Sequence, residues 1–182
     1  MGFRTNFSEA QNGNLKPEGE YECLIAKIEE KQTQSGKMYI NVSFVIRNDV
    51  NQAYKNGYIF HSIGQAREPS AADNQVNGYQ FGRVMALAQA AQLQDGKDYA
   101  NLAEFFADLV KKPVRVKLIH DTWNDKTREA VDTLSPTAFP EVRHVPKTNS
   151  VNNNVYAPAP SRVYNPPAAA QALPIEDEDL PF

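Results

Sequence analysis

The chain has 182 residues, of which 41% are hydrophobic and 10% aromatic, and this composition suits one domain of ordinary size with an extension beside it. The formal net charge of −3 excludes a protein whose surface as a whole is strongly basic. The sequence shows no apolar run of the ~18 residues that a membrane span needs, no secretory signal at residues 1–6, and one cysteine, Cys23, which we expect to be buried. We therefore expect a cytoplasmic protein without a metal, a cofactor or a membrane partner.

Three strands are predicted in the first third of the chain. Residues 19–30 form an apolar run with a polar end, and their pattern leaves open which side faces the core. After a turn at residues 32–37 comes the clearest signal, because every second residue from Met38 to Ile46 is apolar, as in a strand with one buried face. Residues 58–63 predict a third strand, in which we expect Tyr58 and Phe60 to belong to the core rather than to a binding surface.

Two helices and two further strands follow. The first helix is indicated by apolar residues at helical spacing, and it is expected to run to Leu93: Phe81, Val84, Met85 and Ala88. The same spacing recurs at residues 102–109, with Asn101 as the amino-terminal cap and Pro113 as the stop. Residues 114–121 alternate as a fourth strand, residues 123–126 predict a hairpin turn, and residues 127–134 predict a fifth strand.

This order of elements predicts a mainly β protein, namely a five-stranded β-barrel of the OB-fold type with two helices inserted between strands 3 and 4. We expect this domain to span residues 1–143. Other α+β folds share the order, because the order of elements does not by itself fix the topology of a sheet.

The composition changes near Arg143. We expect residues 144–174, rich in proline, asparagine and alanine, to be a disordered linker because they offer too little apolar surface to fold. Residues 175–182 form an acidic tip with an aromatic end, which a partner could hold through its cations and an apolar pocket. A tail that only promotes solubility is the alternative, but it needs no terminal aromatic residue. The predicted docking residues are Glu176, Asp177, Glu178, Asp179, Leu180, Pro181 and Phe182.

The final residues, Glu178-Asp179-Leu180-Pro181-Phe182, resemble the acidic tip of bacterial single-stranded-DNA-binding proteins, in which a Pro-rich linker joins the tip to an OB-fold. The rest of the chain is similar to a phage family found in replication and recombination modules, through residues 2–7, 17–22, 45–50 and 112–116. The resemblance implies a phage single-stranded-DNA-binding protein that coats and protects the strand during replication, recombination or repair in an infected or lysogenic bacterium. It also implies that the tip recruits replication or repair proteins of phage or host.

Such proteins hold single strands on exposed aromatic rings and in basic grooves. If the apolar side of residues 38–46 faces the core, the other side presents Tyr39 as a stacking candidate, with Arg47 near the phosphates. Trp123 at the hairpin tip is the second stacking candidate, although it could instead cover the end of the barrel. The predicted nucleic-acid-binding residues are Tyr39, Asn41, Arg47, Lys111, Lys112, Arg115, Lys117, Trp123, Lys126 and Arg128.

We do not expect an enzyme, since the sequence shows no legible set of nucleophile and base and no phosphate-binding loop. Two alternatives stay open: an adaptor that recruits a replication enzyme without contacting DNA, and a recombination mediator that anneals strands in larger assemblies. A steep loss of DNA affinity with salt would separate a DNA-binding protein from the adaptor. The sequence allows a homo-oligomer but selects no oligomeric state.

Overall fold

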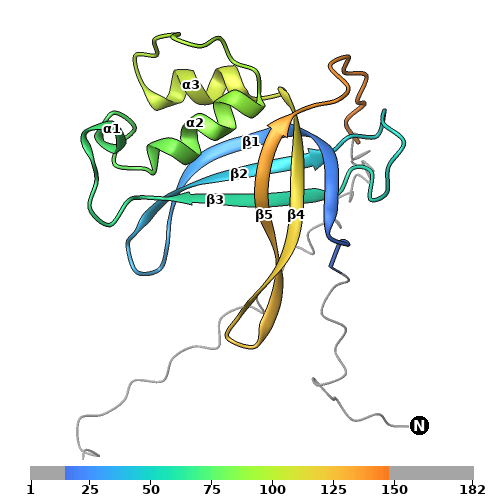
Figure 1. Ribbon diagram of the computed structural model, residues 1–182, viewed down its shortest axis with the longest axis horizontal. Coiled ribbons are helices and arrows are strands. Elements are labelled where there is room, and N and C mark those ends of the chain that lie inside the picture. The colour runs from blue at the N-terminus through green and yellow to red at the C-terminus, as the bar shows by residue number, and fades with distance from the viewer. Residues whose placement is uncertain (1–14, 148–182) are drawn as a thin grey trace, which may run out of the picture. The chain divides into compact units, whose positions relative to one another are not determined.

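A computed structural model describes residues 15–147 of the chain. Within these residues there are five strands and three helices (Figure 1). In chain order they are β1 (Gly19–Gln32), β2 (Met38–Ile46), β3 (Tyr58–Gly64), α1 (Ala71–Asn74), α2 (Phe81–Ala90), α3 (Leu102–Leu109), β4 (Pro113–Trp123) and β5 (Lys126–Pro136). The predicted order is confirmed, and the short helix α1 is an addition to it.

The five strands of residues 15–147 form one antiparallel sheet in the order β3-β2-β1-β4-β5. Strand β1 pairs with β4 along its first half and with β2 along its second, so the β4–β5 hairpin runs across β2 and β3 in Figure 1. The edge strands β3 and β5 contact each other, but no hydrogen-bonded ladder joins them in the described part of the chain. The prediction of a mainly β protein is confirmed, whereas the sheet is not closed into the predicted barrel.

A β-bulge explains why the sequence of β1 did not reveal which side faces the core. The register between β1 and β2 shifts between Ile25 and Lys27. A bulge adds one residue to a strand and so moves its inward positions from odd to even numbers. Cys23 and Ile25 are accordingly buried before the bulge, and Ile28 is buried after it.

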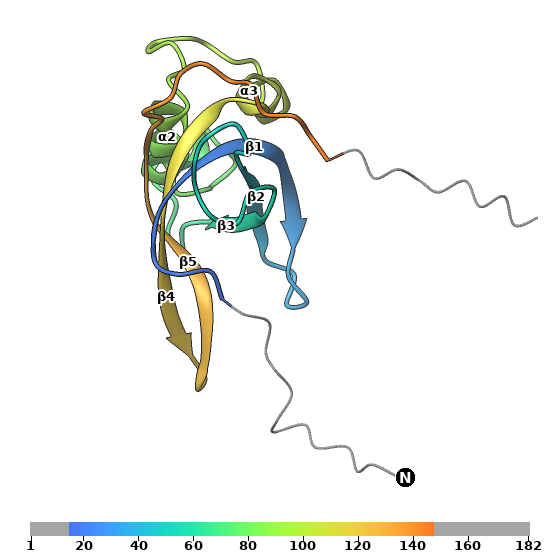
Figure 2. The same ribbon diagram turned by 90° about the vertical axis from the view of Figure 1, so that its right-hand side faces the viewer.

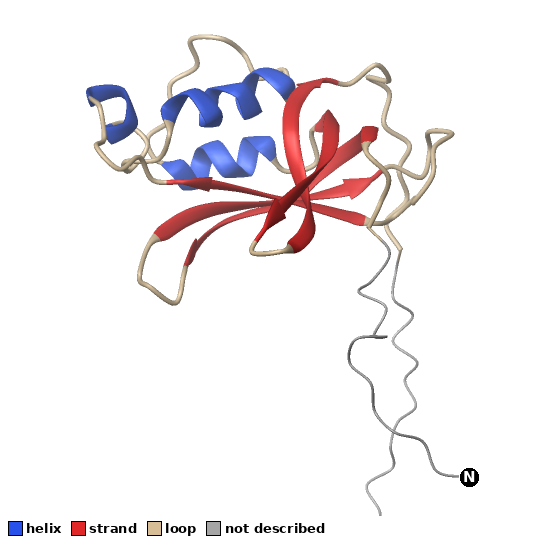
Figure 3. Ribbon diagram, turned by 60° about the horizontal axis from the view of Figure 1, so that its bottom comes forward, coloured by secondary structure: helices blue, strands red, loops and turns tan. Residues whose placement is uncertain are grey.

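The hydrophobic core lies between the sheet and helices α2 and α3 (Figure 3). The predicted alternation of β2 is confirmed, because Ile40, Val42, Phe44 and Ile46 have exposures of 1% or less. They share one buried cluster with residues of the helices, including Leu87. Full burial of each such side chain contributes about 1.5–3 kcal/mol to folding, so the inner face of the sheet is fixed by packing.

The ends of the helices follow local chemistry. The Asn101 side chain accepts a hydrogen bond from the backbone N–H of Glu104 at 3.0 Å, as the predicted cap requires. Helix α3 ends at Leu109, and Pro113 begins β4. Helix α1 has a full capping box, in which Ser70 and Asp73 each bind the other's backbone N–H.

The predicted turn at residues 123–126 is confirmed as the tip of the β4–β5 hairpin. Trp123 pairs with Lys126, and the two residues between them, Asn124 and Asp125, have φ of +49° and +58°. Positive φ at both central residues is the signature of the turn that matches the twist of a hairpin. The tip extends beyond the rest of the sheet (Figures 1 and 2).

Most of the predicted linker, residues 144–174, and all of the predicted tip, residues 175–182, lie outside the described residues; only residues 144–147 of the linker are placed. Among residues 15–147, no helix combines the length and the apolar character required to cross a bilayer.

Candidate nucleic-acid interface

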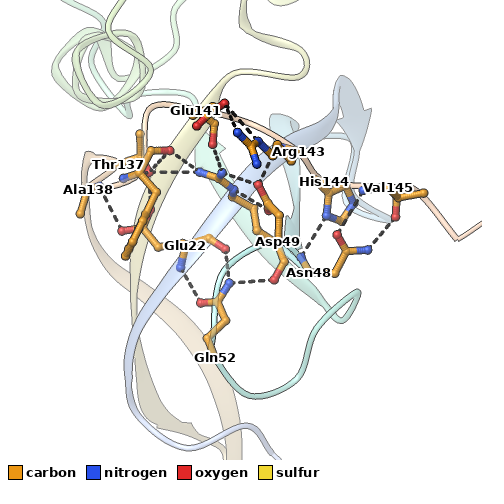
Figure 4. Close-up of polar contacts among 12 residues, drawn as sticks. Glu22, Asn48, Asp49, Gln52, Thr137, Ala138, Glu141, Arg143, His144 and Val145 are labelled. Carbon is orange, nitrogen blue, oxygen red and sulfur yellow. Dashed lines mark hydrogen bonds and ion pairs between the residues drawn. The ribbon is translucent and has the colours of Figure 1, made fainter.

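Arg47, which the sequence placed near DNA phosphates, is a buried structural residue with an exposure of 1%. Its guanidinium donates to both carboxylate oxygens of Asp49, at 3.0 and 2.6 Å (Figure 4). It also donates to the backbone carbonyls of Phe139 and Glu141. The prediction that Arg47 faces outward, near DNA phosphates, is therefore wrong, because all three nitrogens of its guanidinium donate hydrogen bonds within the protein. Arg47 follows β2 at a position that would face solvent, but residues 137–143 cover it.

Glu22 extends this buried network. Its carboxylate accepts hydrogen bonds from Arg115 Nε at 2.9 Å, from the backbone N–H of Ala138 at 3.1 Å and from the hydroxyl of Thr137. We call Glu22, Arg47, Asp49, Arg115 and Thr137 the polar cluster. Burying charges is tolerated only when they are paired and hydrogen-bonded, and the polar cluster meets this condition while fastening residues 137–141 to strands β1 and β2.

The segment after the polar cluster is held as well. Asn48 donates its backbone N–H to His144 Nδ1 at 3.1 Å, and its side chain binds the backbone of Val145 (Figure 4). Burial lowers the pKa of His144, in keeping with a ring nitrogen that accepts a hydrogen bond. Residues 144 and 145 thus pack against the loop between β2 and β3.

The side of β1, β2 and β3 opposite the core is here called the outer face. Paired residues of neighbouring strands lie on the same side of a sheet, and the register therefore defines the members of this face. They are Leu24, Lys27, Glu29 and Lys31 of β1, Tyr39, Asn41, Ser43 and Val45 of β2, and Tyr58, Phe60, Ser62 and Gly64 of β3.

Two aromatic rings stand exposed on the outer face. Tyr58 and Phe60 are 49% and 61% exposed, and their rings are stacked with centroids 6.2 Å apart and planes 13° from parallel. Our prediction that both belong to the core is wrong. Their neighbours Ile59 and Ile63 fill the inward positions of β3 with no exposed surface. The alternation of the strand was visible in the sequence, but the usual burial of large aromatic residues argued for the opposite phase.

The β1 side of the outer face is basic. Lys27 and Lys31 flank Glu29 and both form ion pairs with it. Their hydrogen bonds hold the pKa of Glu29 below its usual range. Because two cations share one anion, these three side chains carry a net positive charge on the same face as the aromatic rings of β3. Sequence reasoning missed these lysines because the pattern of β1 did not show which of its residues face the core and which face outward.

The predicted residues Tyr39 and Asn41 both lie on the outer face, but to different effect. Tyr39 is half-buried and lines a hollow at the start of β2. Asn41 is only 9% exposed and lies between Glu29 and Ser62 of the neighbouring strands. Its neighbours therefore leave it little surface for a ligand, whereas Tyr39 keeps some.

The basic run at residues 111–117 is partly neutralised. Arg115 pairs with Glu22 and Glu20, and Lys117 pairs with Asp132 at 2.7 Å. The backbones of Lys111 and Lys112 bind the backbone of Ile25 beside the bulge of β1. These contacts give the run a structural role and leave Lys111, whose side chain is exposed, as its most available cation.

Trp123 is 64% exposed at the hairpin tip, so it does not cover the end of the sheet within the described structure. Lys126 lies opposite it in the ladder, and Arg128 forms an exposed ion pair with Asp121 at 2.9 Å. The hairpin thus combines an aromatic ring with cations, as predicted, but it lies apart from the outer face in the sheet order.

Cys23 offers no reactive chemistry. Its side chain is fully buried, as predicted, and burial raises the pKa of its thiol far above neutral pH. The described residues thus combine a small open β sheet with an exposed aromatic and basic face.

The chain belongs to a family described as "Protein of unknown function (DUF669)", whose model matches residues 3–158. No match was found among curated proteins.

Proposed function

We propose that this protein binds single-stranded DNA across the outer face. The observation that carries the proposal is the stacked, exposed pair Tyr58–Phe60 on the same face as the lysines of β1, with β2 between them. Leaving two large rings in water forgoes the free energy of burying them, and exposed apolar groups rimmed by polar ones mark binding surfaces. Bases stack on such rings whatever their sequence, and lysines hold the phosphates.

The arrangement of the strands supports the same proposal. We infer that the sheet is an open form of the OB-fold, since β1 pairs with both β2 and β4 and the helices lie between β3 and β4. In OB-folds the face of strands 2 and 3 is a common surface for oligonucleotides. The stacked pair and Tyr39 lie on that face.

The electrostatics favour stacking over charge as the main source of affinity. Over residues 15–147 the lysines and arginines equal the aspartates and glutamates in number, so no excess positive charge attracts nucleic acid from a distance. Duplex DNA keeps its base faces stacked inside the helix. A face that works by aromatic stacking therefore prefers single strands.

The biological setting we propose is phage DNA replication, recombination or repair in the bacterial cytoplasm. Residues 175–182 would recruit replication or repair proteins, with acidic side chains bound by partner cations and Phe182 in an apolar pocket. The alternatives are an adaptor that does not bind DNA and a mediator that anneals strands. The exposed aromatic pair favours a DNA-binding protein over the adaptor.

The test is a fluorescence-anisotropy titration of the full chain against a labelled oligothymidine and a duplex of the same length, at low and moderate salt. We expect tight binding to the single strand and weak binding to the duplex. With about four cations engaged, affinity should fall roughly 50-fold between about 50 and 200 mM salt. Absence of single-strand binding at low salt would overturn the proposal and favour the adaptor.

A further inference from the structure

A hollow is lined by residues from the start of β2 and the end of β3. Figure 1 shows that these strand ends lie near the turn that joins β1 to β2. It continues the outer face, because Tyr39 and Ser62 belong to both. Its lining includes Lys37, Tyr39, Gly64, Gln65, Arg67 and Gln80.

The hollow is open because of a glycine. Gly64 is the partner of Tyr39 in the β2–β3 ladder, so no side chain covers that flank of the tyrosine. A Cβ atom added to Gly64 would meet no atom within 4 Å. The space beside the half-buried Tyr39 ring is therefore free for a flat ligand.

The rim of the hollow carries both hydrogen-bonding groups and cations. Gln65 donates through Nε2 to the carbonyl of Asn77 at 3.0 Å, which fixes its amide and leaves Oε1 as an acceptor. Lys37 and Arg67 are exposed and form no ion pair among residues 15–147. Most other cations of the outer face and of β4 have acidic partners.

We propose that this hollow holds one nucleotide of the bound strand. The base lies against Tyr39 in the space left by Gly64, its edge faces the amides of Gln65 and Gln80, and Lys37 and Arg67 bind the adjoining phosphates. A ligand with a planar ring, polar edges and a nearby anion matches each of these groups. The inference rests on the proposed binding of single-stranded DNA and adds to it a defined pocket at one end of the outer face.

The test fills the hollow in the full chain. Gly64→Leu places a side chain where the base would lie, and Gly82→Leu is the matched control, because a Cβ at Gly82 on α2 also meets open space. Affinity for labelled oligothymidine is measured by anisotropy for both variants and the unmodified chain. We expect about tenfold weaker binding for Gly64→Leu, the loss of roughly one stacked base, and no change for Gly82→Leu.

A second variant keeps the test decisive if Gly64→Leu does not fold. Lys37→Ala with Arg67→Ala removes two exposed cations and should lower the dependence of log affinity on log salt by roughly 1.4. Arg83→Ala with Lys97→Ala, on the helical side, is the charge-matched control. Unchanged affinity in Gly64→Leu, or an unchanged salt dependence in the double variant, overturns the pocket while the proposed function stands. If the unmodified chain binds no single strand, both fall together.

Discussion

The polar cluster and the outer face show two opposite uses of charged and aromatic side chains within one sheet. In the polar cluster, Arg47 is 1% exposed and donates hydrogen bonds to Asp49 and to backbone carbonyls. On the outer face, Phe60 is 61% exposed and touches another exposed ring. Arg47 follows β2 directly, close to Val45, which pairs with Tyr58 of the outer face. The difference therefore comes from residues 137–141, which cover Arg47.

The contrast separates stability from binding. A buried charge that loses its partner destabilises the fold strongly, whereas an exposed ring contributes little to folding. Variants of the polar cluster should therefore change the free energy of unfolding, and variants of the outer face should change affinity for DNA.

Arg47→Met should lower the free energy of unfolding by about 3–5 kcal/mol, because it leaves Asp49 without its cation and removes a charged donor from the carbonyls of residues 139 and 141. Urea titration followed by circular dichroism measures this. Arg143→Met is the control, because the Arg143–Glu141 pair is about three-quarters exposed, and it should change stability by at most about 0.5 kcal/mol. A loss below 1 kcal/mol in Arg47→Met would show that the cluster does not hold the fold.

His61, on the inner side of β3, should make stability depend on pH. Burial, aided by the charge of Arg83, lowers its pKa to about 4, so the folded state binds fewer protons than the unfolded state between that pH and about 6.5. The free energy of unfolding is thus highest above pH 6.5 and falls as pH drops toward 4, by about 3 kcal/mol. His144 acts in the same direction. Comparison with His61→Phe isolates the effect, and equal slopes in the two proteins would contradict it.

Phe60→Ala should weaken binding to oligothymidine by about 1–3 kcal/mol, because it removes one stacking ring, while the urea midpoint stays nearly unchanged. Phe139→Ala is the matched control: its ring is 49% exposed but lies outside the outer face. Equal losses of affinity in both variants, or none in either, would break the link between the stacked pair and DNA.

Trp123→Ala should have a smaller effect on affinity, about 1 kcal/mol, because the hairpin tip is separate from the outer face. Anisotropy with short and long oligothymidine distinguishes the two regions, since only a longer strand can reach both. An affinity equal to that of the unmodified chain for every length would remove Trp123 from the interface.

Removal of residues 180–182 should leave affinity for the single strand unchanged or slightly raised, since an acidic segment competes with DNA for cations. The same truncation should abolish binding of replication or repair proteins, measured by pull-down with the full chain as reference. A large loss of DNA affinity would contradict the separate roles of the two ends.

The order of the strands and helices along the chain could be predicted from local patterns. The inward face of β2 could be predicted because its alternation is unbroken from Met38 to Ile46. The cap at Asn101 and the hairpin at residues 123–126 also follow from short-range chemistry. Whether the sheet closes could not be predicted in this way, because closure depends on β3 meeting β5 along a ladder, which no local pattern specifies and which the described residues do not form.

The site was harder to predict, for two physical reasons. Arg47 was assigned to DNA because the segment that covers it, residues 137–141, lies about ninety residues further along the chain. Tyr58 and Phe60 were assigned to the core because large rings are usually buried, although Ile59 and Ile63 already filled the inward positions. The alternation of β3, given more weight than the size of the rings, would have found the aromatic pair.

Photochemical cross-linking tests the central claim most directly. The full chain is irradiated with bound oligothymidine, and the cross-linked residues are mapped by mass spectrometry. We expect cross-links at Tyr58, Phe60 and Tyr39, where bases would stack on the outer face. Cross-links confined to residues outside β1, β2 and β3, with none on these three rings although the strand is bound, would contradict the claim.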